Sequence, residues 1–154
     1  MKILLRKTAY ETLIKQVIFV EENIDEMLDI VINSGRFSSK EKANQFFQDY
    51  INKIESLFEE IQIIDDKKPQ LKSNVNLLPF IILDCHFTLR DNQGGRYFCH
   101  LSNDNEWDRK NPNIQLYFLT ETGLGLIGKD NGDTVRVDIG MGLVEYTISS
   151  IRII

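Results

Sequence analysis

The sequence predicts an α+β protein in which an N-terminal antiparallel helical hairpin precedes a small β-rich domain with one short helix. Two observations lead to this prediction. Apolar residues repeat with alternating four- and three-residue spacing through the first 64 residues, and strand-like runs separated by turn residues follow from Leu77 onward. The 154 residues, of which 42% are apolar, suffice for one ordinary domain or two small ones.

Two apolar seams predict the hairpin. The first seam consists of Leu13, Val17, Val20, Ile24, Met27 and Val31. The second consists of Ala43, Phe47, Tyr50, Ile54, Leu57, Ile61 and Ile64. Between the seams, Gly35 suits the left-handed conformation that ends a helix, and Ser38 with Glu41 has the spacing of a capping box. So short a connection makes the helices antiparallel, and a projecting coiled coil over residues 1–68 is favoured over a globular bundle.

The helical pattern ends in charged residues and Pro69, and residues 69–76 are predicted to be a linker. Residues 77–154 then form the second domain, with an antiparallel sheet. The expected strands cover residues 80–90, 96–101, 114–119, 134–139 and 143–153. A turn at residues 91–95 joins the first two strands, and a short helix with Thr120 as its N-cap covers residues 120–127.

Charge and hydropathy limit the expected partners and location. A formal net charge of −5 disfavours wrapping nucleic acid over the whole surface, because such binding needs a basic face. A protein partner is therefore expected, without sequence-specific nucleic-acid contact. The apolar runs are far shorter than the roughly 20 residues of a membrane span, and the first residues lack signal-peptide features. We expect no membrane contact and a cytoplasmic location.

Several separated motifs resemble the GreA/GreB family of transcription factors. The run from Leu119 to Val135 is similar to the family's C-terminal signature, above all in the Gly-Leu-Ile-Gly-Lys core at residues 125–129. Residues 87–91, 103–108 and 142–151 resemble its first-hairpin strand, its acidic loop and its ending. The resemblance covers most of residues 77–154. It implies an FKBP-like domain that binds RNA polymerase at the rim of the secondary channel, with the coiled coil reaching inside.

The resemblance implies two sites. The segment that contacts polymerase in the family corresponds to Tyr117, Leu119, Thr120, Glu121 and Thr122, where Thr120-Glu121 replaces the usual Ser-Pro. Alternation along the strand lets only one of Tyr117 and Phe118 face the core. The hairpin tip corresponds to Arg36, Phe37, Ser38, Lys40 and Glu41.

The tip departs from the family's cleavage factors, whose acidic residues help to hold a second Mg²⁺ for RNA hydrolysis. Arg36 stands where the family has Asp, and Glu41, with lysines on both sides, reads better as a helix cap. Transcript cleavage is therefore expected to be weak or absent. We expect no catalytic residue, metal or cofactor in this chain, and contact with RNA or DNA only indirectly, within the polymerase complex.

Two further clusters have alternative interpretations. Glu21, Glu22, Asp25, Glu26 and Asp29 form an acidic group on the first helix. This group is either a solvated face or a surface for basic channel walls or a cation. A second cluster, suggestive of zinc, consists of Cys85, His86, Cys99 and His100. If the turn pairs their strands, the cysteines lie near each other while each adjacent histidine points to the opposite face, so packed, reduced thiols are expected.

Two other functions stay open. Proteins of the Rnk type share the C-terminal domain but have a shorter hairpin, so a regulator acting outside elongation fits the same motifs. A prolyl isomerase would need an apolar pocket of aromatic residues. The candidates are Phe80, Phe87, Tyr97, Phe98, Tyr117 and Phe118, but they alternate as sheet residues do.

Overall fold

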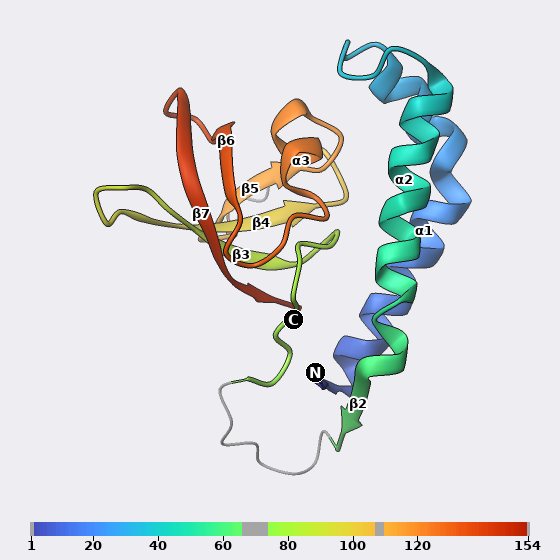
Figure 1. Ribbon diagram of the computed structural model, residues 1–154, viewed down its shortest axis with the longest axis vertical. Helices are drawn as coiled ribbons and strands as arrows, with labels where there is room; N and C mark the ends of the chain where they lie inside the picture. Colours follow the sequence, from blue (N-terminus) through green and yellow to red (C-terminus); the bar gives the residue numbers. More distant parts are fainter. Residues whose placement is uncertain (1, 66–73, 107–109, 154) are drawn as a thin grey trace. The chain divides into compact units, whose positions relative to one another are not determined.

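The computed structural model describes residues 2–65, 74–106 and 110–153. The chain forms two compact units, Met1–Leu77 with Ile153–Ile154, and Leu78–Arg152 (Figure 1). Residues 66–73, which include most of the expected linker, lie outside the described residues. The described part of that linker joins the first unit, where Val75 bridges Leu4 and the Asn76 amide donates to the Leu4 carbonyl at 2.8 Å.

The first unit is built on a helical hairpin, as predicted. Helix α1 (Lys7–Ile32) and helix α2 (Lys40–Glu55) lie side by side and run in opposite directions (Figure 1). Both seams are buried where they lie on the helices, except that Ile24 is half-buried. No described helix combines the length and the apolar character that a membrane span requires.

The second seam does not continue as a helix to Ile64, which corrects the prediction. Helix α2 ends at Glu55, a short 3-10 helix η1 (Phe58–Glu60) follows, and Ile61–Ile64 form strand β2. Strand β2 pairs in parallel with β1 (Ile3–Arg6), a strand that the sequence analysis did not predict. The isoleucine-rich segment has helical spacing, but β-branched residues fit a strand well once a distant partner satisfies their backbone.

The start of α2 also differs from the prediction. Ser39 is the N-cap, with extended backbone (φ −158°, ψ 161°), and its hydroxyl accepts a hydrogen bond from the Lys42 amide at 3.2 Å. The prediction of a capping box between Ser38 and Glu41 is therefore wrong. The N-cap lies one residue later, and the residue three positions after it is Lys42, which cannot complete a capping box. The left-handed conformation of Gly35 is confirmed, with φ at +76°.

The second unit contains a five-stranded sheet in the order β5-β4-β3-β7-β6. The strands are β3 (His86–Arg90), β4 (Arg96–Ser102), β5 (Ile114–Tyr117), β6 (Thr134–Asp138) and β7 (Leu143–Arg152). The α+β class is confirmed. Three of the four pairings are antiparallel, whereas β5 runs parallel to β4, which departs from the predicted antiparallel sheet at this edge.

The first strand of this unit is shorter than predicted. Residues 80–83 and Cys85 are buried but irregular. Within this segment the Ile81 amide donates to the Lys129 carbonyl and the Ile81 carbonyl accepts from the Gly128 amide, so the segment pairs with the residues after α3. Asp84 has a φ of +69°, which interrupts extended backbone immediately before β3. Apolar, β-forming residues thus pack the core here without joining the sheet.

Helix α3 (Glu121–Leu126) begins as predicted, with the Thr120 hydroxyl accepting from the Gly123 amide at 3.1 Å. The helix contacts both edge strands, β5 and β6. Its close approach to the chain depends on Gly123, where a Cβ atom would lie 2.3 Å from the Tyr117 carbonyl oxygen. The segment between β5 and β6 is therefore held tightly against the sheet.

Candidate functional sites: the hairpin tip and a polar groove

The hairpin tip is ordered by one aromatic contact and one ion pair. The Phe37 ring packs against Phe46 of α2, with 5.4 Å between ring centroids. The Lys40 ammonium lies 2.6 Å from Asp29 Oδ1, which joins the start of α2 to the last turns of α1. This hydrogen bond and the charges of Asp29 and Asp25 raise the pKa of Lys40.

These contacts change the interpretation of the tip's charges. Arg36 and Glu41 are exposed, as their predicted place at the tip requires. Asp29 is the member of the acidic α1 group nearest the tip, and its carboxylate forms an ion pair with Lys40. The two residues are 11 apart in sequence and lie on different helices, so the sequence alone does not indicate this pair. The other members of that group are exposed. Among the described residues, no three histidine, cysteine or acidic side chains are grouped so as to hold a metal ion.

The predicted polymerase-binding segment divides into buried and accessible residues. Leu119 is buried, as is Phe118, so the expectation that only one of Tyr117 and Phe118 faces the core is confirmed. Thr120 and Glu121 are exposed. The Thr122 hydroxyl donates to the Asp138 carbonyl at 2.8 Å, which ties the start of α3 to the end of β6.

Three residues of that segment open onto a surface pocket. Tyr117, Thr120 and Thr122 line a pocket of about 390 Å³, together with side chains from the loop after β4. A second pocket, of about 430 Å³, shares Asp104, Glu106 and Gln115 with the first. We call these two pockets together the polar groove. The residues that define it here are Asp84, His100, Asp104, Glu106, Gln115, Tyr117 and Asp138.

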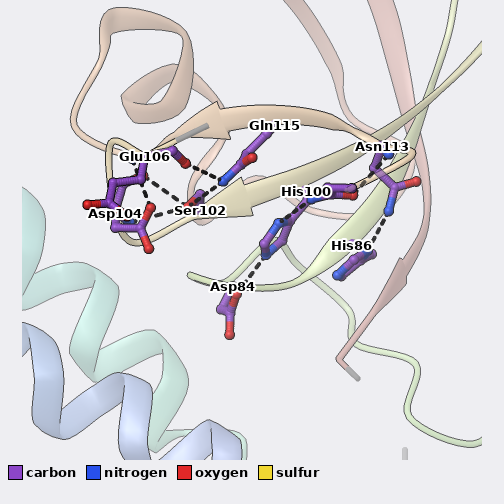
Figure 2. A network of polar contacts seen from close by, with 9 residues as sticks. Asp84, His86, His100, Ser102, Asp104, Glu106, Asn113 and Gln115 are labelled. Atoms are coloured by element: carbon purple, nitrogen blue, oxygen red, sulfur yellow. Dashed lines mark hydrogen bonds and ion pairs between the residues drawn. The ribbon is translucent and has the colours of Figure 1, made fainter. Parts of the chain in front are cut away.

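A hydrogen-bond network at one end of the polar groove surrounds His100 (Figure 2). Nε2 of His100 lies 2.6 Å from Asp84 Oδ1, and Nδ1 of His100 lies 3.3 Å from the side-chain amide nitrogen of Asn111. Because that amide can only donate, the ring proton is assigned to Nε2, which donates to the carboxylate. The His100 ring also stacks on His86, with centroids 4.5 Å apart, and His86 Nδ1 accepts from Asn113 at 3.1 Å. Burial and the neighbouring His100 lower the pKa of His86.

The register around the 91–95 turn explains this histidine pair and places the two cysteines on one face of the sheet, offset by two residues instead of directly opposite each other. The Asp91 amide donates to the Gly95 carbonyl, and His86 then pairs with His100 while Cys99 pairs with Phe87. Cys85 instead accepts at its carbonyl from the Leu101 amide. This register could have been predicted from the sequence. If the turn is centred on residue 93, residues at equal distances before and after it pair, which places His86 opposite His100.

The cysteines and histidines lie on opposite faces of the sheet, as expected from strand alternation, so they are not gathered as a zinc site would require. Both cysteines are free and buried, and burial raises the pKa of each thiol to about 12.

The loop after β4 carries two of the acidic residues of the groove, Asp104 and Glu106 (Figure 2). The Ser102 hydroxyl donates to the Asp104 carbonyl at 3.0 Å and accepts from the Asp104 amide at 3.2 Å. Asp104 Oδ1 accepts from the Glu106 amide, and the Gln115 side chain donates to the Glu106 carbonyl, each at 3.0 Å. The remainder of the predicted acidic loop, residues 107–108, lies outside the described residues.

The chain thus combines an antiparallel helical hairpin with an α+β unit that carries a polar groove. No protein-family model and no curated protein matches it. Among solved structures, GreA factor homolog 1 (Gfh1) of Thermus thermophilus has 18% identity and a TM-score of 0.44, over 99% of each chain. Thermus aquaticus Gfh1 has 17% identity and a TM-score of 0.42, over 98% of each chain. The elongation factor GreA/GreB from Nitrosomonas europaea has 14% identity and a TM-score of 0.42, over 98% of this chain and 99% of its own.

Proposed function

We propose that this protein is a Gre-type transcription factor that binds bacterial RNA polymerase at the secondary channel through its sheet unit and inserts its hairpin. The observation that carries the proposal is the placement of the Gre-like signature. Residues 119–135 form the cap, body and end of α3 and the turn into β6, and they leave Thr120 and Glu121 exposed beside a pocket. A recognition role explains why these polar residues face solvent on a segment that is otherwise tightly packed.

The proposed factor has no active site of its own and stimulates transcript cleavage weakly or not at all. Recruiting a second Mg²⁺ needs a carboxylate whose charge is uncompensated. At this tip the Asp29 carboxylate is paired with Lys40, and Glu41 lies between two lysines and close in sequence to Arg36. Competition with a true cleavage factor for the channel follows from docking without that ligand. A cytoplasmic location and the absence of a cofactor accompany this proposal.

The shortness of α2, the second helix of the hairpin, supports keeping a Rnk-type regulator as the alternative function. Helix α2 has 16 residues against 26 in α1, so its helical span is about 24 Å at 1.5 Å per residue. A short arm is what a Rnk-type regulator acting outside elongation would have. Cleavage and pausing assays on elongation complexes distinguish the two roles, because only a factor that reaches the active centre alters either.

The docking proposal is tested by pull-down of core RNA polymerase with the full chain at low salt. We expect retention by the wild type and clear loss for Glu121→Lys, which reverses a charge on the exposed face of α3. The matched control is Glu145→Lys, the same reversal at an exposed position of β7. Absence of any polymerase retention by the wild type would refute the proposed function.

A further inference from the structure

The face of the sheet that points away from the core is rich in arginine. Along β3 and β4, Phe87, Leu89 and Cys99 are buried, so the residues that alternate with them point to the opposite face. The strand register carries this face, which we call the outer sheet face, across β7 and β6. Its charged residues on these four strands are Arg90, Arg96, Arg136, Arg152, Asp138 and Glu145. Arginines therefore outnumber acidic residues here, although the formal net charge of the chain is −5.

Two of these arginines lie directly opposite each other. Arg90 pairs with Arg96 beside the 91–95 turn, and like charges in such a cross-strand pair, with Cβ atoms about 5 Å apart, repel each other. Both side chains are exposed, and neither forms an ion pair with a residue that the structure describes. The nearby Asp91 carboxylate accepts hydrogen bonds within its own turn and from the Tyr97 hydroxyl, which belongs to the core face. An anion bound between the two guanidinium groups would remove their repulsion.

An aromatic ring and two hydroxyl groups flank the arginine pair on the same face. Phe98 is two residues from Arg96 along β4, about 7 Å away, and is 59% exposed. In the other direction, Thr147 lies opposite Arg90 and Thr134 lies opposite Thr147, and both threonines are exposed. Flat aromatic surface, cationic groups and hydroxyls are the groups that bind the bases, phosphates and riboses of single-stranded RNA.

We propose that the outer sheet face binds single-stranded RNA without sequence specificity, with a base stacked on Phe98 and a phosphate held by Arg90 and Arg96. Charge complementarity supports an anionic occupant, because the arginine pair lacks a carboxylate partner among the described residues. The exposed ring favours a nucleic acid over an acidic protein segment, since every unpaired base has a face that can stack on it. The hydroxyls of Thr134 and Thr147 favour RNA over DNA, because they can hydrogen-bond to a 2′-hydroxyl.

This face is separate from the segment proposed to dock on polymerase. Ser102, at the other end of β4 from Arg96, is the residue that pairs with Tyr117. The length of β4 therefore separates the arginine pair from residues 117–122, by about 20 Å at 3.3 Å per residue. The inference goes beyond the proposed function and does not depend on it, because RNA binding at this face requires no polymerase.

The first test measures the affinity of the full chain for a fluorescein-labelled oligouridine of about ten nucleotides by fluorescence anisotropy at low salt. Phe98→Ala should weaken binding by about tenfold through loss of one stacked base, whereas Phe98→Trp should retain the affinity. The matched control is Leu143→Ala, which removes another exposed apolar side chain of the same face, at the start of β7. Equal affinities of wild type and Phe98→Ala, or equal losses in Phe98→Ala and Leu143→Ala, would overturn the proposal.

The second test concerns the arginine pair and uses the same probe over a range of salt concentrations. Replacing both Arg90 and Arg96 with Gln should weaken binding and reduce the slope of log affinity against log salt by about 0.7, the contribution of one phosphate contact. The matched control is Lys15→Gln, which removes a positive charge at an exposed position of α1 and should leave the slope unchanged. An unchanged slope in the double variant would show that the arginines do not hold a phosphate, and would overturn the proposal.

Two competitor ligands identify the occupant. Oligothymidine of the same length should bind more weakly than oligouridine, and equal affinity would overturn the assignment to RNA. A hexa-glutamate peptide should not displace the oligouridine, and displacement at similar concentration would assign the face to an acidic protein segment instead. Polymerase retention in the pull-down should be the same for Phe98→Ala and wild type, so failure of RNA binding and failure of the proposed function are distinguishable.

Discussion

Replacing Gly123 with alanine tests whether close packing of α3 holds the predicted docking segment in place. The alanine Cβ would lie 2.3 Å from the Tyr117 carbonyl oxygen and 2.6 Å from the Phe118 Cα. Both neighbours are backbone atoms, so no side-chain rotation can relieve the contact. Overpacking of this kind costs about 1–3 kcal/mol, and a contact against backbone belongs at the upper end of that range.

The loss of stability expected for Gly123→Ala is opposite to the effect that helix propensity alone would give. Alanine in place of glycine inside a helix ordinarily stabilises by about 1 kcal/mol. The net expectation is therefore a loss of about 2 kcal/mol from the free energy of unfolding of the sheet unit. The steric term dominates because α3 contacts strands on both edges of the sheet and cannot move outward without losing those contacts.

The assay is urea unfolding followed through the NMR signals of β3 and β7, which report on the sheet unit alone. Glu121→Ala is the matched control, because Glu121 is an exposed residue of the same helix and should change stability by less than about 0.5 kcal/mol. The same Gly123→Ala protein should lose polymerase retention in the pull-down. A Gly123→Ala variant as stable as the wild type, or more stable, would refute the packing argument.

Three other predictions follow from the tip, the helix cap and the histidine pair. Wild-type protein should give little transcript cleavage in a backtracked complex and Arg36→Asp should give more, whereas efficient wild-type cleavage abolished by Glu41→Ala would contradict our interpretation of the tip. Ser39→Ala should destabilise the hairpin by about 1 kcal/mol in thermal unfolding followed by circular dichroism, and Ser38→Ala should have little effect; the reverse order would restore the capping box. Because the fold lowers the pKa of His86 from 6.5, the unfolded state takes up a proton first, so the free energy of unfolding should decrease as pH falls through 6.5. His86→Gln should flatten that decrease, and an unchanged pH profile would show that His86 does not cause it.

Features set by near neighbours in the chain could be derived from the residues alone. The two seams, the left-handed Gly35 and the Thr120 cap depend on periodicity over a few turns or on one side chain meeting an amide three residues away. The 91–95 turn is similar, since Asp91 accepts from backbone amides two and four residues farther on. Such contacts form within one segment, so the order of residue types is enough to predict them.

Other features arise where distant segments meet, and no local pattern specifies which segments these are. Ile61–Ile64 has the spacing of a helix and becomes a strand because β1, far away in the sequence, offers parallel pairing. The pairing of Lys40 with Asp29 similarly requires the antiparallel packing of two helices.

The candidate site shows the same division. The resemblance to a family indicated the segment at residues 117–122. The stacking of His86 on His100 depends instead on the strand register, where a shift of one residue would move each side chain to the other face. The polar groove needs a parallel β5 beside β4 and the end of β6 beside α3, so its existence is a property of the tertiary structure.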